Sequence, residues 1–257
     1  MRSPLLRKGG LFLALSLLFT TLLPAPTQAL SNFKVAPSTV WGHTYAGKAV
    51  GNPTTTPPKV FNLEAKSKFV VNYKNFPDWA KKDFQSAVDI WAANFSSAAP
   101  ITIDASWGRA PSWGVLGSAR PGNYYSGFDG APDQSLWYPS ALANALAGKD
   151  LDLQNPDMVI QINSLASWNT RNDGTPQANE YDLPSVFLHE LAHGLGFLST
   201  DSYDSFFGYG TIEQPTPYAA YAQLPDGRRL SDLSSPSIEL GKALTSKLVW
   251  SGQFGNA

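Results

Sequence analysis

Residues 188–197 constrain the fold of this chain more than any other segment. They read Leu-His-Glu-Leu-Ala-His-Gly-Leu-Gly-Phe, with two histidines four positions apart and a glutamate directly after the first. Side chains spaced by four lie on one face of an α-helix, with about 5–6 Å between their Cβ atoms. If the segment is helical, His189 and His193 therefore stand side by side.

The residues around this segment also favour a helix. Asp182 is a suitable N-cap, and Pro184 falls in the first turn, where the missing N–H costs little. Gly194 and Gly196 follow the second histidine and can end the helix. We therefore predict a helix that begins near residue 183 and carries the histidine pair close to its end.

The histidine pair predicts a metal site. Zinc is commonly bound by imidazole nitrogens, and a glutamate between two such histidines can act on a metal-bound water as a general base. We expect His189 and His193 to be zinc ligands and Glu190 to be the catalytic residue. The only other histidine, His43, lies in a stretch with little periodicity, and we expect it at the surface.

The third ligand stays open at the level of sequence. No histidine follows His193, so a downstream ligand must be a carboxylate or, less typically, a tyrosinate. Asp201, Asp204 and Glu213 are the candidates, and solvated loop carboxylates are the alternative for each. An incomplete or degenerate site is a second possibility. Candidates for an oxyanion partner are Tyr203, Tyr209, Tyr218 and Tyr221.

Composition excludes several classes of protein. The 257 residues are 43% hydrophobic and 15% charged, which fits one large globular domain. There is no cysteine, which rules out disulfides, thiolate metal sites and a cysteine nucleophile. A net charge of −1 gives no basic footprint for nucleic acid.

The N-terminus predicts export. Basic residues precede an apolar run at Leu11–Leu23, and small residues follow up to Ala29. This pattern is typical of a secretory signal peptide, residues 1–29. Its removal takes 3 of 19 basic residues and none of the 20 acidic ones, so 16 against 20 gives −4. We expect a secreted or periplasmic protein, of bacterial origin, with no membrane contact after cleavage.

The rest of the chain predicts an irregular arm and linker at 30–65 and one folded domain at 66–257. The predicted strands are 68–73, 101–105, 115–119 and 158–162, and the predicted helices are 77–94, 140–147 and 237–250. Strands mixed with well-separated helices indicate an α+β fold. We expect a twisted mixed sheet with a long backing helix and the helix that carries the histidines.

The segment His189–Phe197 resembles the active-site helix of the zincin metallopeptidases, and its His-Glu-x-x-His-x-x-Gly pattern resembles the metzincin branch. Within that resemblance, Gly114–Ala119 is similar to a substrate-facing edge strand and Met158–Trp168 to the strand and loop that follow. With Trp137-Tyr138-Pro139 and Leu248-Val249-Trp250, the chain also resembles secreted bacterial zincin-like proteins that often precede a protease-associated domain. The resemblance covers about 66–252 and implies a zincin-like fold.

Two departures from the metzincin pattern matter. Ser199 stands where that branch has its third ligand, and no methionine follows the helix. The resemblance implies a secreted zinc-dependent endopeptidase, a zinc metallopeptidase that cleaves peptide or protein substrates as a monomer. The alternative is a noncatalytic exported protein, stabilised by zinc, with a degenerate protease site and a binding or surface role. A fragment of a longer protein is a third possibility, because relatives of this kind continue past residue 257.

Overall fold

The computed structural model describes residues 33–47, 64–110, 112–171 and 175–252. The predicted signal peptide lies outside these residues. Within the described ranges, no helix combines the length and the apolar character needed to cross a bilayer.

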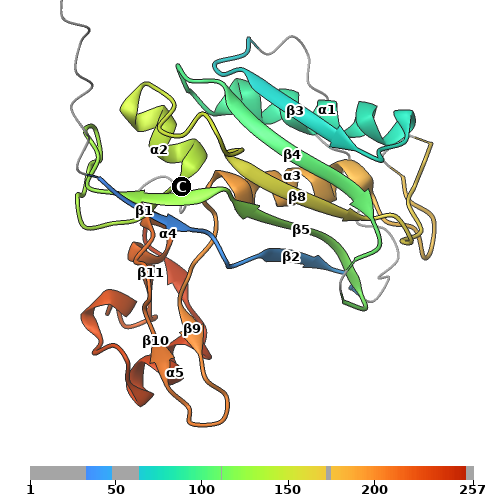
Figure 1. The fold of residues 1–257 in the computed structure, drawn as a ribbon. Coiled ribbons are helices and arrows are strands. Elements are labelled where there is room, and N and C mark those ends of the chain that lie inside the picture. The colour runs from blue at the N-terminus through green and yellow to red at the C-terminus, as the bar shows by residue number, and fades with distance from the viewer. Residues whose placement is uncertain (1–32, 48–63, 111, 172–174, 253–257) are drawn as a thin grey trace, which may run out of the picture. The chain divides into compact units, whose positions relative to one another are not determined.

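The main sheet has five strands in the order β2-β5-β8-β4-β3 (Figure 1). Their bounds are β2 Gly42–Tyr45, β3 Phe69–Lys74, β4 Ile101–Gly108, β5 Val115–Pro121 and β8 Met158–Asn163. The strands β3, β4 and β8 are parallel, and β5 runs antiparallel to both β8 and β2. Four of these strands correspond to the predicted ones, and their ends differ by at most three residues.

Two helices pack on the same face of this sheet, α1 at Asp78–Asn94 and α3 at Leu183–Leu195 (Figure 1). The chain crosses from β3 to the parallel strand β4 through α1. The other face of the sheet is polar, because side chains alternate along a strand: in β4, Ile103 is buried and Asp104 is exposed. The helices therefore cover the apolar face of the sheet.

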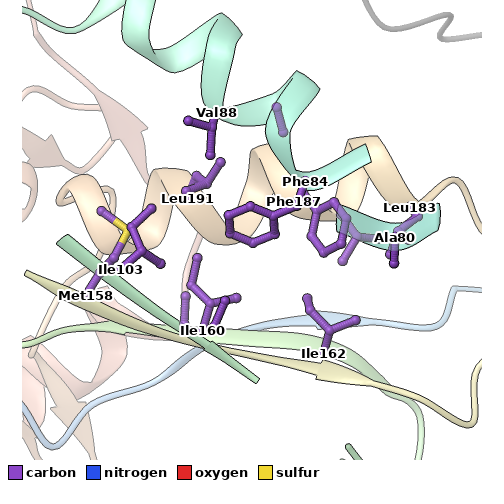
Figure 2. Packing of buried hydrophobic residues seen from close by; sticks show 14 of the residues in the cluster. Ala80, Phe84, Val88, Ile103, Met158, Ile160, Ile162, Leu183, Phe187 and Leu191 are labelled. Atoms are coloured by element: carbon purple, nitrogen blue, oxygen red, sulfur yellow. The ribbon is translucent and has the colours of Figure 1, made fainter. Parts of the chain in front are cut away.

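The core between the helices and the sheet fixes the place of α3 (Figure 2). Phe187 of α3 packs against Phe84 of α1, with ring centroids 4.7 Å apart, and both are fully buried. Leu191 of α3 lies between Val88 of α1 and the sheet in the same cluster. Since all these residues are close-packed, α3 cannot shift without opening a cavity in the core.

The segment predicted as an irregular arm contributes strands to two sheets. Strand β1 (Lys34–Pro37) pairs with β6 (Asn123–Ser126) in a three-stranded sheet that β7 (Tyr138–Pro139) completes. Strand β2 pairs with β5 in the main sheet. These strands belong to the same compact unit as the rest of the described chain. The folded part therefore begins well before residue 66, because long-range pairing overrides the weak local pattern.

The helix α2 (Ser140–Ala147) packs on the three-stranded sheet and matches the predicted short helix. It follows β7 directly and ends at Gly148, which has a left-handed backbone conformation (φ 67°). Its Ala143 is buried with Tyr125, Phe128 and Tyr138 in a second apolar cluster.

The C-terminal part forms short elements around a third cluster of leucines. They are β9 Ser202–Tyr203, β10 Gly210–Thr211, α4 Pro217–Ala220, β11 Ala222–Gln223, a 3₁₀ turn Leu230–Asp232, α5 Ile238–Leu244 and β12 Val249–Trp250. The helix predicted at 237–250 is thus too long. Helix α5 ends at Leu244, where the Thr245 hydroxyl donates to the carbonyl of Gly241. Strand β12 follows and pairs with β11.

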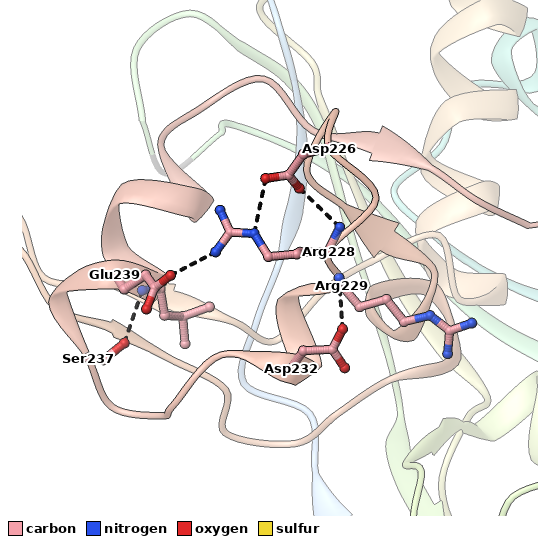
Figure 3. Close-up of polar contacts among 7 residues, drawn as sticks. Asp226, Arg228, Arg229, Asp232, Ser237 and Glu239 are labelled. Carbon is pink, nitrogen blue, oxygen red and sulfur yellow. Dashed lines mark hydrogen bonds and ion pairs between the residues drawn. The ribbon is translucent and has the colours of Figure 1, made fainter.

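Polar contacts tie the turns of this part together (Figure 3). Arg228 donates to Asp226 at 3.0 Å and to Glu239, in α5, at 2.8 Å. The backbone N–H of Arg229 donates to Asp232 at 3.1 Å. The groups of both ion pairs are more than half exposed, so packing of the leucine cluster holds α5 in place more than these contacts do.

Candidate functional site

The helix α3 carries the candidate site and has the predicted ends. The Asp182 carboxylate caps it by accepting from the Ser185 N–H at 3.0 Å and the Ser185 hydroxyl at 2.6 Å. At the other end, the N–H of Gly196 donates to the carbonyl of Ala192, and Gly196 has a φ of 120° that favours glycine. The sequence prediction of this helix is confirmed.

The two histidines of α3 converge. Their Nε2 atoms are 2.8 Å apart, and the two rings are nearly perpendicular. The Nδ1 atom of His193 lies 2.8 Å from the carbonyl oxygen of Phe197. A carbonyl only accepts, so His193 carries its proton on Nδ1 and keeps a lone pair on Nε2. His189 then donates from its Nε2 to that lone pair.

Both imidazoles favour their neutral form. Burial lowers the pKa of His189, and burial followed by the charges of the other histidines lowers the pKa of His193, against an opposing bond to Phe197. Neutral imidazole is the form that binds a metal ion. The hydrogen bond from His193 to a backbone carbonyl is also the orienting contact that ligating histidines usually make.

Glu190 is fully buried beneath the sheet edge. Its Oε1 atom accepts from the Thr44 N–H at 3.1 Å and from the Thr44 hydroxyl at 2.5 Å. Its Oε2 atom is buried and has no hydrogen-bond partner among the described residues. Burial raises the pKa of Glu190 to about 7, although the bonds from Thr44 act in the opposite direction. This carboxyl group is therefore close to its midpoint at neutral pH.

Glycines let three strands approach α3 closely. A Cβ atom on Gly42 of β2 would lie 2.3 Å from the His193 ring, and one on Gly117 of β5 would lie 2.8 Å from Glu190 Oε1. On α3 itself, a Cβ atom on Gly194 would lie 2.5 Å from the sulfur of Met158 in β8. Larger residues at these positions would push the sheet away from the helix.

None of the proposed third ligands reaches the histidine pair. The described residues contain no group of three or more His, Cys, Asp or Glu side chains that could hold a metal ion. The Ser199 hydroxyl accepts from the Asp201 N–H, and Asp204 accepts from the N–H groups of Phe206 and Phe207. The exposed Glu213 accepts from the Ser202 hydroxyl. These groups stabilise the turns that follow the helix.

The other predicted positions lie away from the histidine pair or beside it without a direct role. His43 points to the opposite face of β2 from Gly42 and bonds through Nδ1 to the Ser118 hydroxyl at 2.8 Å. Of the four tyrosines, Tyr218 packs between Phe197 and Trp250, and Tyr221 packs on Trp250. Tyr203 and Tyr209 are exposed on the β9–β10 hairpin.

The residues present fit part of a zinc site. Two neutral imidazoles whose Nε2 atoms converge suit two ligands of one ion once the proton of His189 moves from Nε2 to Nδ1. Beside them, the buried Oε2 atom of Glu190 has no hydrogen-bond partner among the described residues, although buried polar atoms usually have one. A third side-chain ligand of the four usual types is missing from the described residues.

Comparison with known families identifies the family of this chain. A family model described as SPBPB7E8-like matches residues 60–212, which is more than half of the chain and includes α3. The chain belongs to the SPBPB7E8-like family. No curated protein and no solved structure matches this SPBPB7E8-like protein.

The assignment to the zincin metallopeptidases, metzincin branch, is therefore wrong. The family found is the SPBPB7E8-like one, and the described residues lack the three-ligand group which that assignment requires. The reason is physical: a motif on one helix sets only two ligands, and the third depends on where the rest of the chain folds. The residues His189–His193 are nevertheless present, and the candidate site depends on their geometry alone.

Sequence reasoning missed Gly42 and Thr44, which contact His193 and Glu190 from the arm. A signal was available, because Trp41-Gly42-His43-Thr44-Tyr45 is rich in residues that favour strands. The partner strand β5 lies about 70 residues further along the chain. The signal therefore predicts a strand but not which strand it pairs with.

Proposed function

We propose that this protein is an exported zinc-dependent endopeptidase in which His189 and His193 hold the ion and Glu190 is the general base. The observation that carries the proposal is the convergence of two neutral imidazoles beside a buried carboxyl group. A zinc ion held there supplies an activated water and polarises the substrate carbonyl. The N-terminal sequence pattern supports export, and the acidic balance of the mature chain leaves nucleic acid out as a substrate.

The side chains have distinct parts in this proposal. The bond from His193 Nδ1 to Phe197 keeps Nε2 turned toward His189. Glu190 takes a proton from the attacking water and later delivers it to the leaving amine. Thr44 holds Oε1, so that Oε2 is the oxygen left to exchange a proton.

The first test of the proposal measures zinc binding. Dialysed wild-type protein is expected to retain about one zinc ion per chain by elemental analysis, and His189→Ala and His193→Ala are expected to lose it. Wild-type protein that takes up no divalent ion at neutral pH overturns the proposal.

The role of Glu190 needs a second measurement. Glu190→Gln keeps the shape of the side chain and is expected to bind zinc while casein hydrolysis falls by about 100-fold or more. Glu64→Gln makes the same change at an exposed position and is the matched control. Measurable hydrolysis that is equal in Glu190→Gln and wild type contradicts the role of Glu190.

A second candidate function is a noncatalytic exported protein in which zinc is structural. The lack of a third side-chain ligand among the described residues favours it. In that case zinc raises the melting temperature, and neither wild type nor any variant hydrolyses a peptide. Hydrolysis that depends on Glu190 excludes this candidate.

A further inference from the structure

Strand β2 lies where the sequence predicts a free sheet edge. The segment 115–119 was expected to present its edge to an extended substrate, but β2 covers it along its length. Gly42 pairs with Ala119, His43 with Ser118, and Thr44 with Gly117. The N–H of Ala46 continues the contact by donating to the carbonyl of Gly114 at 2.7 Å. An extended peptide that adds to a sheet makes the same backbone bonds.

The strand also touches both reactive groups of the candidate site. The Cα of Gly42 lies against the His193 ring so closely that an added Cβ atom would be 2.3 Å from it. Two residues along, Thr44 donates twice to Glu190. Strand β2 therefore contacts both an imidazole and the carboxyl group of the candidate site.

Few side-chain contacts attach β2 to the rest of the sheet. The strand has four residues, and the Tyr45 side chain is 62% exposed. On the face away from α3, His43 bonds to Ser118, and Arg120 lies 5.2 Å from the ring centroid of Trp41. No large apolar side chain of β2 enters the core. Few apolar side-chain contacts therefore have to break for β2 to separate from β5.

From these contacts we infer that β2 is a built-in occupant of the peptide-binding groove, and that it blocks the site until it is displaced. The inference rests on the proposed function, since it names the regulation and the substrate class of that same site. An extended polypeptide would bind antiparallel to β5 in place of β2. It would need glycine facing His193, because the space there is closed to a Cβ atom.

The perturbation that tests this is Gly42→Val in the full chain. The new side chain overlaps the His193 ring, so β2 is expected to leave the edge of β5. Gly47→Val is the matched control, because a Cβ atom there meets nothing within 4 Å. Thr44→Val is a second variant of nearly unchanged shape that removes only the hydroxyl donor to Glu190.

Two measurements read out the displacement. The first is the anisotropy of a labelled peptide with the sequence of residues 40–46. It is expected to bind Gly42→Val at least about tenfold more tightly than wild type or Gly47→Val, because β2 competes at high effective concentration in the latter two. The second is hydrogen exchange of β5 amides, which is expected to be faster in Gly42→Val. Thr44→Val is expected to change both in the same direction by less.

Hydrolysis then separates this inference from the function. Peptide binding by Gly42→Val with no hydrolysis, in a zinc-loaded folded protein, supports the groove and contradicts the endopeptidase. Full hydrolysis by wild type, with no gain in peptide binding or β5 exchange in folded Gly42→Val, overturns the inference and leaves the function standing. If Gly42→Val does not fold, unchanged peptide binding and exchange in Thr44→Val overturn the inference.

Discussion

Asp83 of α1 is a buried acid whose removal should stabilise the protein. It is 4% exposed, and its Oδ2 atom has no hydrogen-bond partner among the described residues. Burial, followed by the nearby charge of Asp182, raises the pKa of Asp83 from 3.8 to about 6. Asp182 is the N-cap of α3, so this acid pair lies between α1 and the helix that carries the candidate site.

The sign of the pH dependence follows from this rise in pKa. Between about pH 4 and pH 6 the native state keeps a proton that the unfolded state has lost, so the free energy of unfolding falls as pH rises through this window. At about 1.36 kcal/mol for each pH unit between the two pKa values, Asp83 costs at most about 3 kcal/mol at pH 7. Asp83→Asn removes the charge and this cost.

We therefore expect Asp83→Asn to raise the melting temperature at pH 7 by up to about 6–12 °C, and to have little effect at pH 4. Thermal and urea unfolding at pH 4 to 8 measure both. Asp89→Asn is the control, because Asp89 is an exposed acid on the same helix. If Asp83→Asn is no more stable than wild type at pH 7, or gains equally at pH 4, the electrostatic argument is wrong.

Three further changes test how α3 and the C-terminal part are held. Asp182→Ala removes the cap of α3 and should cost about 1 kcal/mol in urea unfolding at pH 5, where Asp83 keeps its proton and is not repelled by Asp182; no loss at that pH would show that the cap contributes nothing. Gly194→Ala forces a methyl group against Met158, and we expect this overpacking to cost about 1–3 kcal/mol. The cost should exceed the roughly 1 kcal/mol by which alanine favours a helix over glycine. A variant more stable than wild type contradicts this. Arg228→Ala breaks two exposed ion pairs and should lower stability less than Asp182→Ala, measured at two salt concentrations; a larger loss would indicate a structural role.

Local signals in the sequence were enough to predict α3 and its histidine pair. The N-cap at Asp182, the proline of the first turn and the glycine at the end all act within a few residues, so they can be recognised from neighbours in the chain. The spacing of four then places His189 and His193 on one face whatever the rest of the fold does. The helix α1 was predictable for the same reason, from the periodic spacing of Phe84 and Val88.

The arm and the third ligand could not be predicted in this way. The place of β2 depends on pairing with β5, more than 70 residues further along the chain, and four residues carry too little pattern to select a partner. Whether Asp201, Asp204 or Glu213 meets the histidines depends on how the turns after α3 fold. In the structure Asp204 accepts from backbone N–H groups and Glu213 from the Ser202 hydroxyl, whereas the Oδ1 atom of Asp201 is buried without a hydrogen-bond partner among the described residues.

The sequence by itself thus determined a helix with two imidazoles on one face and an acid between them, because helical geometry repeats every few residues. Only the tertiary structure decided what surrounds that acid. The sheet edge buries Glu190, Thr44 takes one of its oxygens, and Gly42 closes the space above His193. These contacts join residues almost 150 positions apart, and such contacts arise from the packing of whole elements, which no local spacing encodes.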